Sequence, residues 1–218
     1  MPDLTRIEGI GAPLPTPNLD TDQIMPKQFL RGIDKSGLAK GLLYDMRYDA
    51  DHQLRTDFVL NRPEYRGTSI LVAGSNFGCG SSREHAVWGL QQYGIQAIIA
   101  SSYGEIFYSN AMNNRLMLVM LPEETVQQIM ADVADPTSSQ VTIDVERMTV
   151  RSRNVQAPFT LSERHRNMFL QGLDIIGATL AMQSRIAEFQ QRHWAARPWL
   201  KDIGHVTKAR LEPAGLAA

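Results

Sequence analysis

Three short apolar runs alternate with two segments of helical periodicity in the middle of the chain. The apolar runs cover residues 69–73, 97–101 and 116–121, and the helix-like segments cover residues 82–93 and 103–112. Apolar runs of this length that alternate with helices are typical of βαβαβ units, whose strands are parallel. The sequence therefore predicts an α/β fold with a parallel βαβ core.

The pattern changes in the second half of the chain. Pro122 predicts a helix start, because proline suits the first turn of a helix and the acidic residues after it suit the helix dipole. Beyond residue 135, three short stretches resemble antiparallel strands, at 141–145, 148–151 and 159–161. Two further helices are predicted, from Ser162 to Leu170 and from Thr179 to Trp194. We expect one domain over residues 1–195 and a flexible tail over residues 196–218.

The first third of the chain has weaker patterns. Up to Pro17 it is rich in Gly and Pro, and the alternating segment from Ile7 to Ile10 predicts an edge strand followed by a loop. Residues 32–67 lack a clear period and contain scattered Gly, Asp and Arg. They predict long loops with one short helix, which form a mobile region that could cover a site.

Composition excludes several classes of protein. The chain has 218 residues, 43% of them hydrophobic and 21% charged, as expected of a soluble globular protein with one core. A net charge of -1 without a basic stripe argues against nucleic acid as a partner. No apolar run approaches the roughly 18 residues of a membrane span. Cys79 is the only cysteine, which fits a reducing compartment, and we expect a cytoplasmic protein.

Residues 74–85, GSNFGCGSSREH, form the most informative motif. They lie between a predicted strand and a predicted helix, where α/β proteins bind anions. Helix-start amides contribute roughly 0.3 to 1 kcal/mol to an anion, and a charge-assisted arginine bond roughly 1.5 to 3 kcal/mol. The motif therefore predicts a site for a carboxylate or a phosphate, with Ser82 and Arg83 facing the ligand.

The same residues also fit a structural role. Ser81-Ser-Arg-Glu84 matches a capping box, in which the serine and the glutamate would each bond a free amide of the other. A phosphate-binding loop would need a lysine after Gly80, and a dinucleotide fingerprint would need a glycine where Arg83 stands. Both are missing, which argues against a nucleotide.

Two other groups of polar residues have alternative interpretations. Asp20 and Asp22 either bond local amides in a turn or orient a catalytic group; they lack the further ligands of a calcium loop. His85 either makes a local structural bond or takes part in proton transfer. The five histidines lie far apart without the spacing of zinc ligands, so no metal site made by this chain is expected.

The motif also carries a family resemblance. Residues 76–88, NFGCGSSREHAVW, resemble the small-subunit family of 3-isopropylmalate dehydratase, within the aconitase superfamily. Three further blocks agree in order, at residues 18–30, 105–114 and 172–177. The resemblance spans nearly the whole chain, and it implies a swivelling β/β/α domain like the last domain of single-chain aconitases.

The resemblance also implies an activity and a partner. In this family, a small subunit and a large subunit together interconvert 2-isopropylmalate and 3-isopropylmalate through isopropylmaleate, a step of leucine biosynthesis. It implies that Ser81 is the catalytic base and that Ser82 and Arg83 contact a carboxylate of the dicarboxylate substrate. We expect Asp20, Asp22, Glu84 and His85 to support these three residues. The [4Fe-4S] cluster, whose iron binds the departing hydroxyl, would belong to the large, cysteine-containing subunit. One cysteine in this chain fits that expectation.

One segment departs from the family pattern. Where the bacterial family carries Arg-Thr-Gly-Phe, this chain has Asp34-Lys-Ser-Gly-Leu38. Lysine cannot form the two-pronged contact of arginine with a carboxylate, so Arg31 becomes the candidate for a second substrate arginine. Two alternatives stay open: the same chemistry on a methyl-substituted malate, citraconate or homoaconitate-type acid, and a carboxylate-binding module without catalysis.

Overall fold

The computed structural model describes residues 5–30 and 36–211 of the chain. Its contacts divide the chain into two compact units, Met1–Ile175 and Ile176–Ala218. The predicted division between residues 195 and 196 falls at the end of helix α8 (Gln183–Ala196) and stays a prediction.

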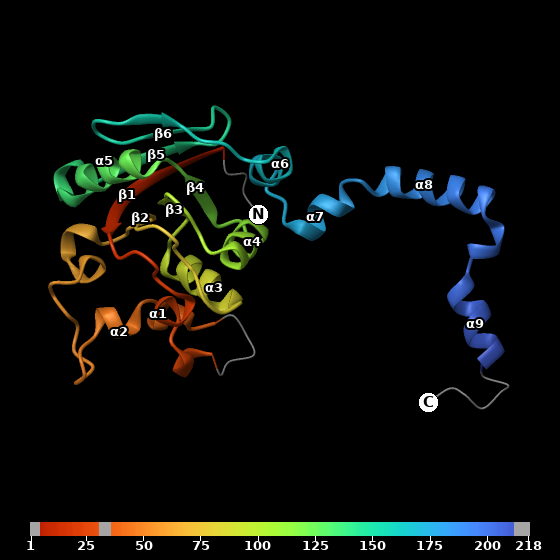
Figure 1. The fold of residues 1–218 in the computed structure, drawn as a ribbon, viewed down its shortest axis with the longest axis horizontal. Coiled ribbons are helices and arrows are strands. Elements are labelled where there is room, and N and C mark those ends of the chain that lie inside the picture. Colours follow the sequence, from red (N-terminus) through yellow and green to blue (C-terminus); the bar gives the residue numbers. More distant parts are fainter. Residues whose placement is uncertain (1–4, 31–35, 212–218) are drawn as a thin grey trace. The chain divides into compact units, whose positions relative to one another are not determined.

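The first unit is built on one seven-stranded mixed sheet (Figure 1). In spatial order its strands are β4 (Met117–Met120), β3 (Ala97–Ala100), β2 (Ile70–Ala73), β1 (Arg6–Leu14), β5 (Gln140–Asp144), β6 (Thr149–Arg151) and β7 (Gln156–Pro158). Strands β1 to β4 pair in parallel, and β5 to β7 add antiparallel pairs. The predicted parallel βαβ core and added hairpin are confirmed, although the last strand lies at 156–158 and not at 159–161.

The two halves of the sheet differ in burial as their sequences do. Every residue of β2 and β3 is buried, whereas β5 alternates between buried and partly or fully exposed positions. Continuous apolar strands suit a parallel sheet covered on both faces, and alternation suits a sheet with one face in water. The core therefore lies around the parallel strands.

The helices of this unit are α1 (Thr21–Ile24), α2 (Tyr44–Arg47), α3 (Glu84–Tyr93), α4 (Glu105–Asn113), α5 (Glu123–Ala134) and α6 (Glu163–Leu170). Helices α3 to α6 begin and end close to the predicted positions, whereas no bounds are predicted for the two short helices α1 and α2. Pro122 is the N-cap of α5, and the Ser162 hydroxyl accepts from the amide of His165 at the start of α6, as predicted. Helix α5 packs against β1, β2 and β3, and α3 packs against α4.

The predicted edge strand at Ile7–Ile10 is wrong in its position. Strand β1 lies inside the sheet, with β2 on one side and β5 on the other. A Cβ atom on Gly9 would lie 2.0 Å from the Ser69 hydroxyl oxygen, and one on Gly11 would lie 2.8 Å from a methyl group of Val133. The glycines that suggest a loop in the sequence are therefore needed for close packing in the interior.

The predicted loop region holds more regular structure than the one short helix expected. Besides α2 it contains three 3-10 turns, at Leu38–Gly41, Val59–Asn61 and Pro63–Tyr65, and a fourth lies just before it at Lys27–Phe29. The buried Tyr65 hydroxyl donates to the carbonyl oxygens of Val133 and Ala134 at 2.8 and 2.9 Å. Burial raises the pKa of Tyr65, so this donor keeps its proton and holds the region to the end of α5. Mobility of residues 32–67 stays a prediction.

Asp132 joins helix α5 to the turn between β6 and β7. Its buried carboxylate accepts from the Ser152 hydroxyl at 2.6 Å, from the Asn154 amide at 2.8 Å and from the Asn154 side chain at 2.6 Å. Burial alone would raise the pKa of Asp132, but these hydrogen bonds outweigh it and hold the pKa below its ordinary value. The charged form of Asp132 therefore stabilises the fold.

We expect Asp132→Asn to lower the free energy of unfolding by about 2 to 3 kcal/mol at neutral pH, because an amide cannot accept all three bonds. Since the folded pKa is lowered, this contribution is complete above the unfolded pKa of about 3.9 and is lost as pH falls through the folded value. Urea unfolding at several pH values should show the difference from wild type shrinking below about pH 4. Glu146→Gln, at an exposed position of the same region, is the control; an equal loss there would contradict the prediction.

The second unit contains α8, α9 (Ile203–Leu211) and the 3-10 turn Pro198–Leu200, and α7 (Ile175–Leu180) begins one residue before it. The single helix predicted from Thr179 to Trp194 is therefore two helices, and α9 lies where a flexible tail was expected. No helix in the described residues is long and apolar enough to cross a membrane.

Candidate functional site

The loops that follow β1, β2 and β3 meet at the carboxyl edge of the parallel strands. The amide of Gly78 donates to the Leu19 carbonyl at 2.7 Å, and the amide of Thr21 donates to the Cys79 carbonyl at 2.9 Å. On the other side, the amide of Phe77 donates to the Ser102 carbonyl at 3.1 Å. Two of the motifs in the sequence, 18–30 and 74–85, are thereby brought together at the edge where open α/β sheets bind ligands.

Two glycines allow these loops to approach so closely. Gly78 has a positive φ of 74°, and a Cβ atom there would lie 2.3 Å from the Phe107 ring. A Cβ atom on Gly104 would lie 2.6 Å from the Gly78 carbonyl oxygen and 2.9 Å from the Cys79 Cα. The path of residues 78–80 therefore depends on both positions remaining glycine.

The predicted capping box at Ser81 and Glu84 is wrong. Helix α3 begins at Glu84, its N-cap is Arg83, and no side chain bonds the cap. The Glu84 carboxylate instead accepts from the side-chain amide of Asn114 at 2.7 Å. Arg83 is extended, with φ of -122° and ψ of 103°, so Ser81 lies too far before the helix to cap it.

Ser81 and Ser82 present their side chains to solvent in front of α3. The Ser81 carbonyl oxygen accepts a hydrogen bond from the Thr21 hydroxyl at 2.9 Å, which fixes its backbone, while within the described residues neither serine hydroxyl takes part in a hydrogen bond. Thr21 is a residue that the sequence reasoning missed. The sequence does contain a signal that could have identified Thr21, because this residue lies between Asp20 and Asp22 in one of the blocks that resemble the family.

The two aspartates have different roles. Asp20 caps α1: its carboxylate accepts from the Gln23 amide at 2.7 Å, and the Gln23 side chain accepts from the Asp20 amide at 3.0 Å. Asp22 forms an ion pair with Arg83, whose side chain is only 17% exposed. The local interpretation therefore holds for Asp20, whereas Asp22 pairs with an arginine about 60 positions further along the chain.

The remaining candidates contribute packing or lie elsewhere. The His85 ring packs 4.8 Å from the Trp88 ring, centre to centre, and the Cys79 thiol donates to the Asn18 carbonyl at 3.3 Å. Arg31 falls outside the described residues, as do the first two residues of the departing segment 34–38, so its predicted role stays a prediction.

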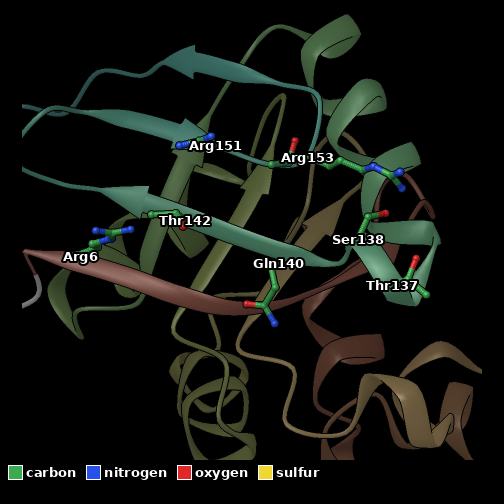
Figure 2. A pocket seen from close by; sticks show the side chains of 8 residues that line it. Arg6, Thr137, Ser138, Gln140, Thr142, Arg151 and Arg153 are labelled. Atoms are coloured by element: carbon green, nitrogen blue, oxygen red, sulfur yellow. The ribbon is translucent and has the colours of Figure 1, made fainter.

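Cationic hollows occur in other parts of the first unit. One of about 470 Å³ lies over the antiparallel strands and is lined by Arg6, Arg151 and Arg153 together with five polar residues (Figure 2). Another, of about 430 Å³, is lined by Arg47, Arg62 and Arg66 among others. Ser81, Ser82 and Arg83 line neither of these two hollows.

Over the described ranges, 5–30 and 36–211, no three His, Cys, Asp or Glu side chains gather as a metal site. An iron–sulfur cluster is bound by several cysteine thiolates, and Cys79 is the only cysteine in the sequence. The residues of this chain therefore do not fit a cluster of their own.

The mixed sheet and the serine–arginine loop at its carboxyl edge define a domain of the aconitase C-terminal type. The family model described as the aconitase C-terminal domain matches residues 1–124, and the model of the C-terminal domain of the 3-isopropylmalate dehydratase small subunit matches residues 176–203. The chain belongs to the 3-isopropylmalate dehydratase small-subunit family.

Relatives support this assignment over nearly the full length. The 3-isopropylmalate dehydratase small subunit 1 of Chromobacterium violaceum is 70% identical over 207 residues, which are 95% of this chain and 98% of that protein. The small subunit of Phenylobacterium zucineum is 46% identical, over 92% of this chain and 99% of that one. The crystal structure of 3-isopropylmalate dehydratase from Methanocaldococcus jannaschii has a TM-score of 0.61 at 25% identity, and covers 84% of this chain and 98% of that chain. The predicted family and fold are confirmed.

Proposed function

We propose that this chain is the small subunit of a 3-isopropylmalate dehydratase, which interconverts 2-isopropylmalate and 3-isopropylmalate by dehydration and rehydration in leucine biosynthesis. The observation that carries the proposal is the position of Ser81. This serine is exposed and stands two residues before Arg83 in the sequence, and Arg83 forms an ion pair with Asp22. The relatives that match the chain end to end carry the same name.

In this proposal Ser81 is the base that removes the proton beside a substrate carboxylate. A serine hydroxyl is a weak base in water, so its alkoxide must be stabilised by hydrogen-bond donors in a site from which water is excluded. Helix α3 has no side-chain cap, so its first amides can turn their partial positive charge toward this anion. The exposure of Ser81 means that another surface has to exclude the water.

Arg83 and Ser82 bind the carboxylate of the substrate. Asp22 occupies one side of the Arg83 guanidinium group and leaves other N–H donors of its planar fork for the ligand. The ion pair also fixes the orientation of Arg83, so that less side-chain entropy is lost when the substrate binds.

The second half of the site belongs to the large subunit. We infer that this partner carries the iron–sulfur cluster, since the single cysteine here cannot bind one. The reaction would take place in the cytoplasm. A methyl-substituted malate, citraconate or homoaconitate-type acid remains the second candidate substrate, because Asp34-Lys-Ser-Gly-Leu38 replaces the arginine-containing segment usual in the family.

A reconstitution assay tests the proposed function. The purified chain is mixed with the large subunit of the same organism, loaded with its cluster, and the mixture is assayed on 2-isopropylmalate and on the alternative acids. We expect turnover only with both chains, and the highest kcat/KM on 2-isopropylmalate. Turnover by this chain alone would refute the proposal, and a higher kcat/KM on another acid would change the substrate.

Replacing Arg83 by lysine tests the carboxylate clamp. Lysine keeps the charge but loses the planar fork, so we expect Arg83→Lys to raise the Michaelis constant about 10- to 100-fold, the loss of one charge-assisted bond of 1.5 to 3 kcal/mol. Steady-state kinetics of the reconstituted enzyme measure this. Arg153→Lys, at an exposed arginine over the antiparallel strands, is the matched control. An unchanged Michaelis constant for Arg83→Lys would remove Arg83 from the clamp.

A further inference from the structure

Exposed apolar side chains gather in residues 176–211, called here the C-terminal segment. They include Leu180, Met182, Ile186, Phe189, Trp199 and Ile203. Phe189 is 59% exposed and Trp199 is 70% exposed, and no residue of this segment is buried. Large apolar side chains that gather on one exposed surface mark an interaction site more often than singly scattered ones do.

Three of these side chains lie on one face of helix α8. Met182, Ile186 and Phe189 follow one another at spacings of four and three residues, which places them in one stripe along the helix. Arg185, Glu188 and Arg192, at spacings of three and four residues, form a charged stripe beside it. The helix is therefore amphipathic.

A helix of this length does not stabilise itself in water. Isolated helices shorter than about 12 to 15 residues are marginal, and most helical stability in proteins comes from packing of the amphipathic face. Helix α8 has 14 residues and α9 has nine, and neither contains a buried side chain. The second unit therefore does not cover its own apolar face.

The family comparison indicates that the large subunit provides the covering surface. The aconitase model, which matches residues 1–124, describes a C-terminal domain, a part of a longer chain. The second model begins at residue 176, where the second unit begins, and it is specific to small subunits, which are separate chains. A domain that is a separate chain has to bind the rest of the enzyme, the large subunit, non-covalently. The C-terminal segment contains the residues that the small-subunit model matches and the aconitase model does not.

The charge of the C-terminal segment also favours the large subunit as its partner over a second copy of the segment. Residues 176–218 contain six Lys and Arg against three Asp and Glu, a net charge of +3, whereas residues 1–175 contain 16 against 20, a net charge of -4. Two copies of the basic segment would repel each other, and an acidic surface would attract it. Phe, Met, Trp and Arg are also the residues enriched in protein interfaces.

We propose that the C-terminal segment docks onto the large subunit, with the Met182, Ile186 and Phe189 stripe in an apolar groove that is flanked by carboxylates. This inference rests on the proposed function, because it takes the large dehydratase subunit as the occupant. The segment contributes affinity for the partner and no group to the chemistry.

The test places a charge in the stripe. The full-length variants Ile186→Glu and Phe189→Glu keep a good helix former, and Gln191→Glu, which lies on the opposite side of α8, introduces the same charge as a control. We expect each stripe variant to raise the Kd for the large subunit by about 100-fold, as for a central interface residue, and the control to change it less than about threefold. At saturating concentrations of the small subunit, kcat should stay near wild type for all three.

The outcomes separate this inference from the proposed function. If the wild-type chain binds the large subunit and restores turnover while both stripe variants bind equally tightly, the docking inference is overturned and the function stands. Loss of self-association, or of binding to anionic phospholipid vesicles, without a change in Kd for the large subunit would assign the stripe to another occupant and also overturn it. If the wild-type chain supports no turnover but the variants still lose affinity, the function fails and the docking surface stands.

Discussion

Ser81→Ala is expected to lower kcat of the reconstituted enzyme by about 10³-fold or more, because positioned general bases contribute 10²- to 10⁴-fold. The Michaelis constant should change little, since the Arg83–Asp22 ion pair and the Thr21 contact to the Ser81 carbonyl do not involve the lost hydroxyl. Steady-state kinetics at saturating partner concentration measure both values.

Ser82→Ala is the matched control for this experiment. It removes a hydroxyl from the neighbouring exposed position, where the proposal assigns only substrate binding. We expect Ser82→Ala to change the Michaelis constant more than kcat. If Ser81→Ala retains more than about a tenth of wild-type turnover, Ser81 is not the base, since that loss falls below the range of general-base catalysis.

Gly104→Ala is expected to lower kcat about 100-fold while the chain still folds, because a displacement of about 1 Å in a catalytic group can cost that much. The added Cβ would lie 2.6 Å from the Gly78 carbonyl oxygen, so the backbone of residues 78–80 has to move. This would shift the start of the segment that carries Ser81. Kinetics of the reconstituted enzyme and the far-UV circular dichroism of the isolated chain measure the two effects.

Gly204→Ala serves as the control for Gly104→Ala, because nothing lies within 4 Å of a Cβ atom placed there. It should leave kcat unchanged. A Gly104→Ala variant with wild-type kcat would show that the loop tolerates the displacement, and the close contact between residues 78 and 104 would then have no catalytic consequence.

The sequence predicts the parallel half of the fold well, because its evidence is local. The apolar runs that become β2 and β3 and the helix start at Pro122 are each encoded within a few residues. Strand β1 is different: its glycines suggest a loop, and only its neighbours Ser69 and Val133, distant in the sequence, explain them. In β1, packing against residues that are distant in the sequence overrides the local pattern.

The candidate site shows the same distinction. The residue types around Ser81 indicate an anion site, and the family resemblance assigns their roles. What the sequence does not supply is the pairing of Arg83 with Asp22 or the bond from Thr21 to Ser81, since these residues are about 60 positions apart. The capping box fails for a related reason: the contact between Glu84 and Asn114 competes with the local bond.

Strand β1 also constrains the order in which the chain can fold. Its first half, Arg6–Ile10, pairs with β5 at residues 140–144, and its second half, Gly11–Leu14, pairs with β2 at residues 70–73. Contacts between residues so far apart in sequence form slowly, because a long loop must close before they form. During synthesis the N-terminal residues leave the ribosome first, but they must wait for more than half of the polypeptide before both halves find their neighbours. The earliest strand to be made is therefore among the last to be completed.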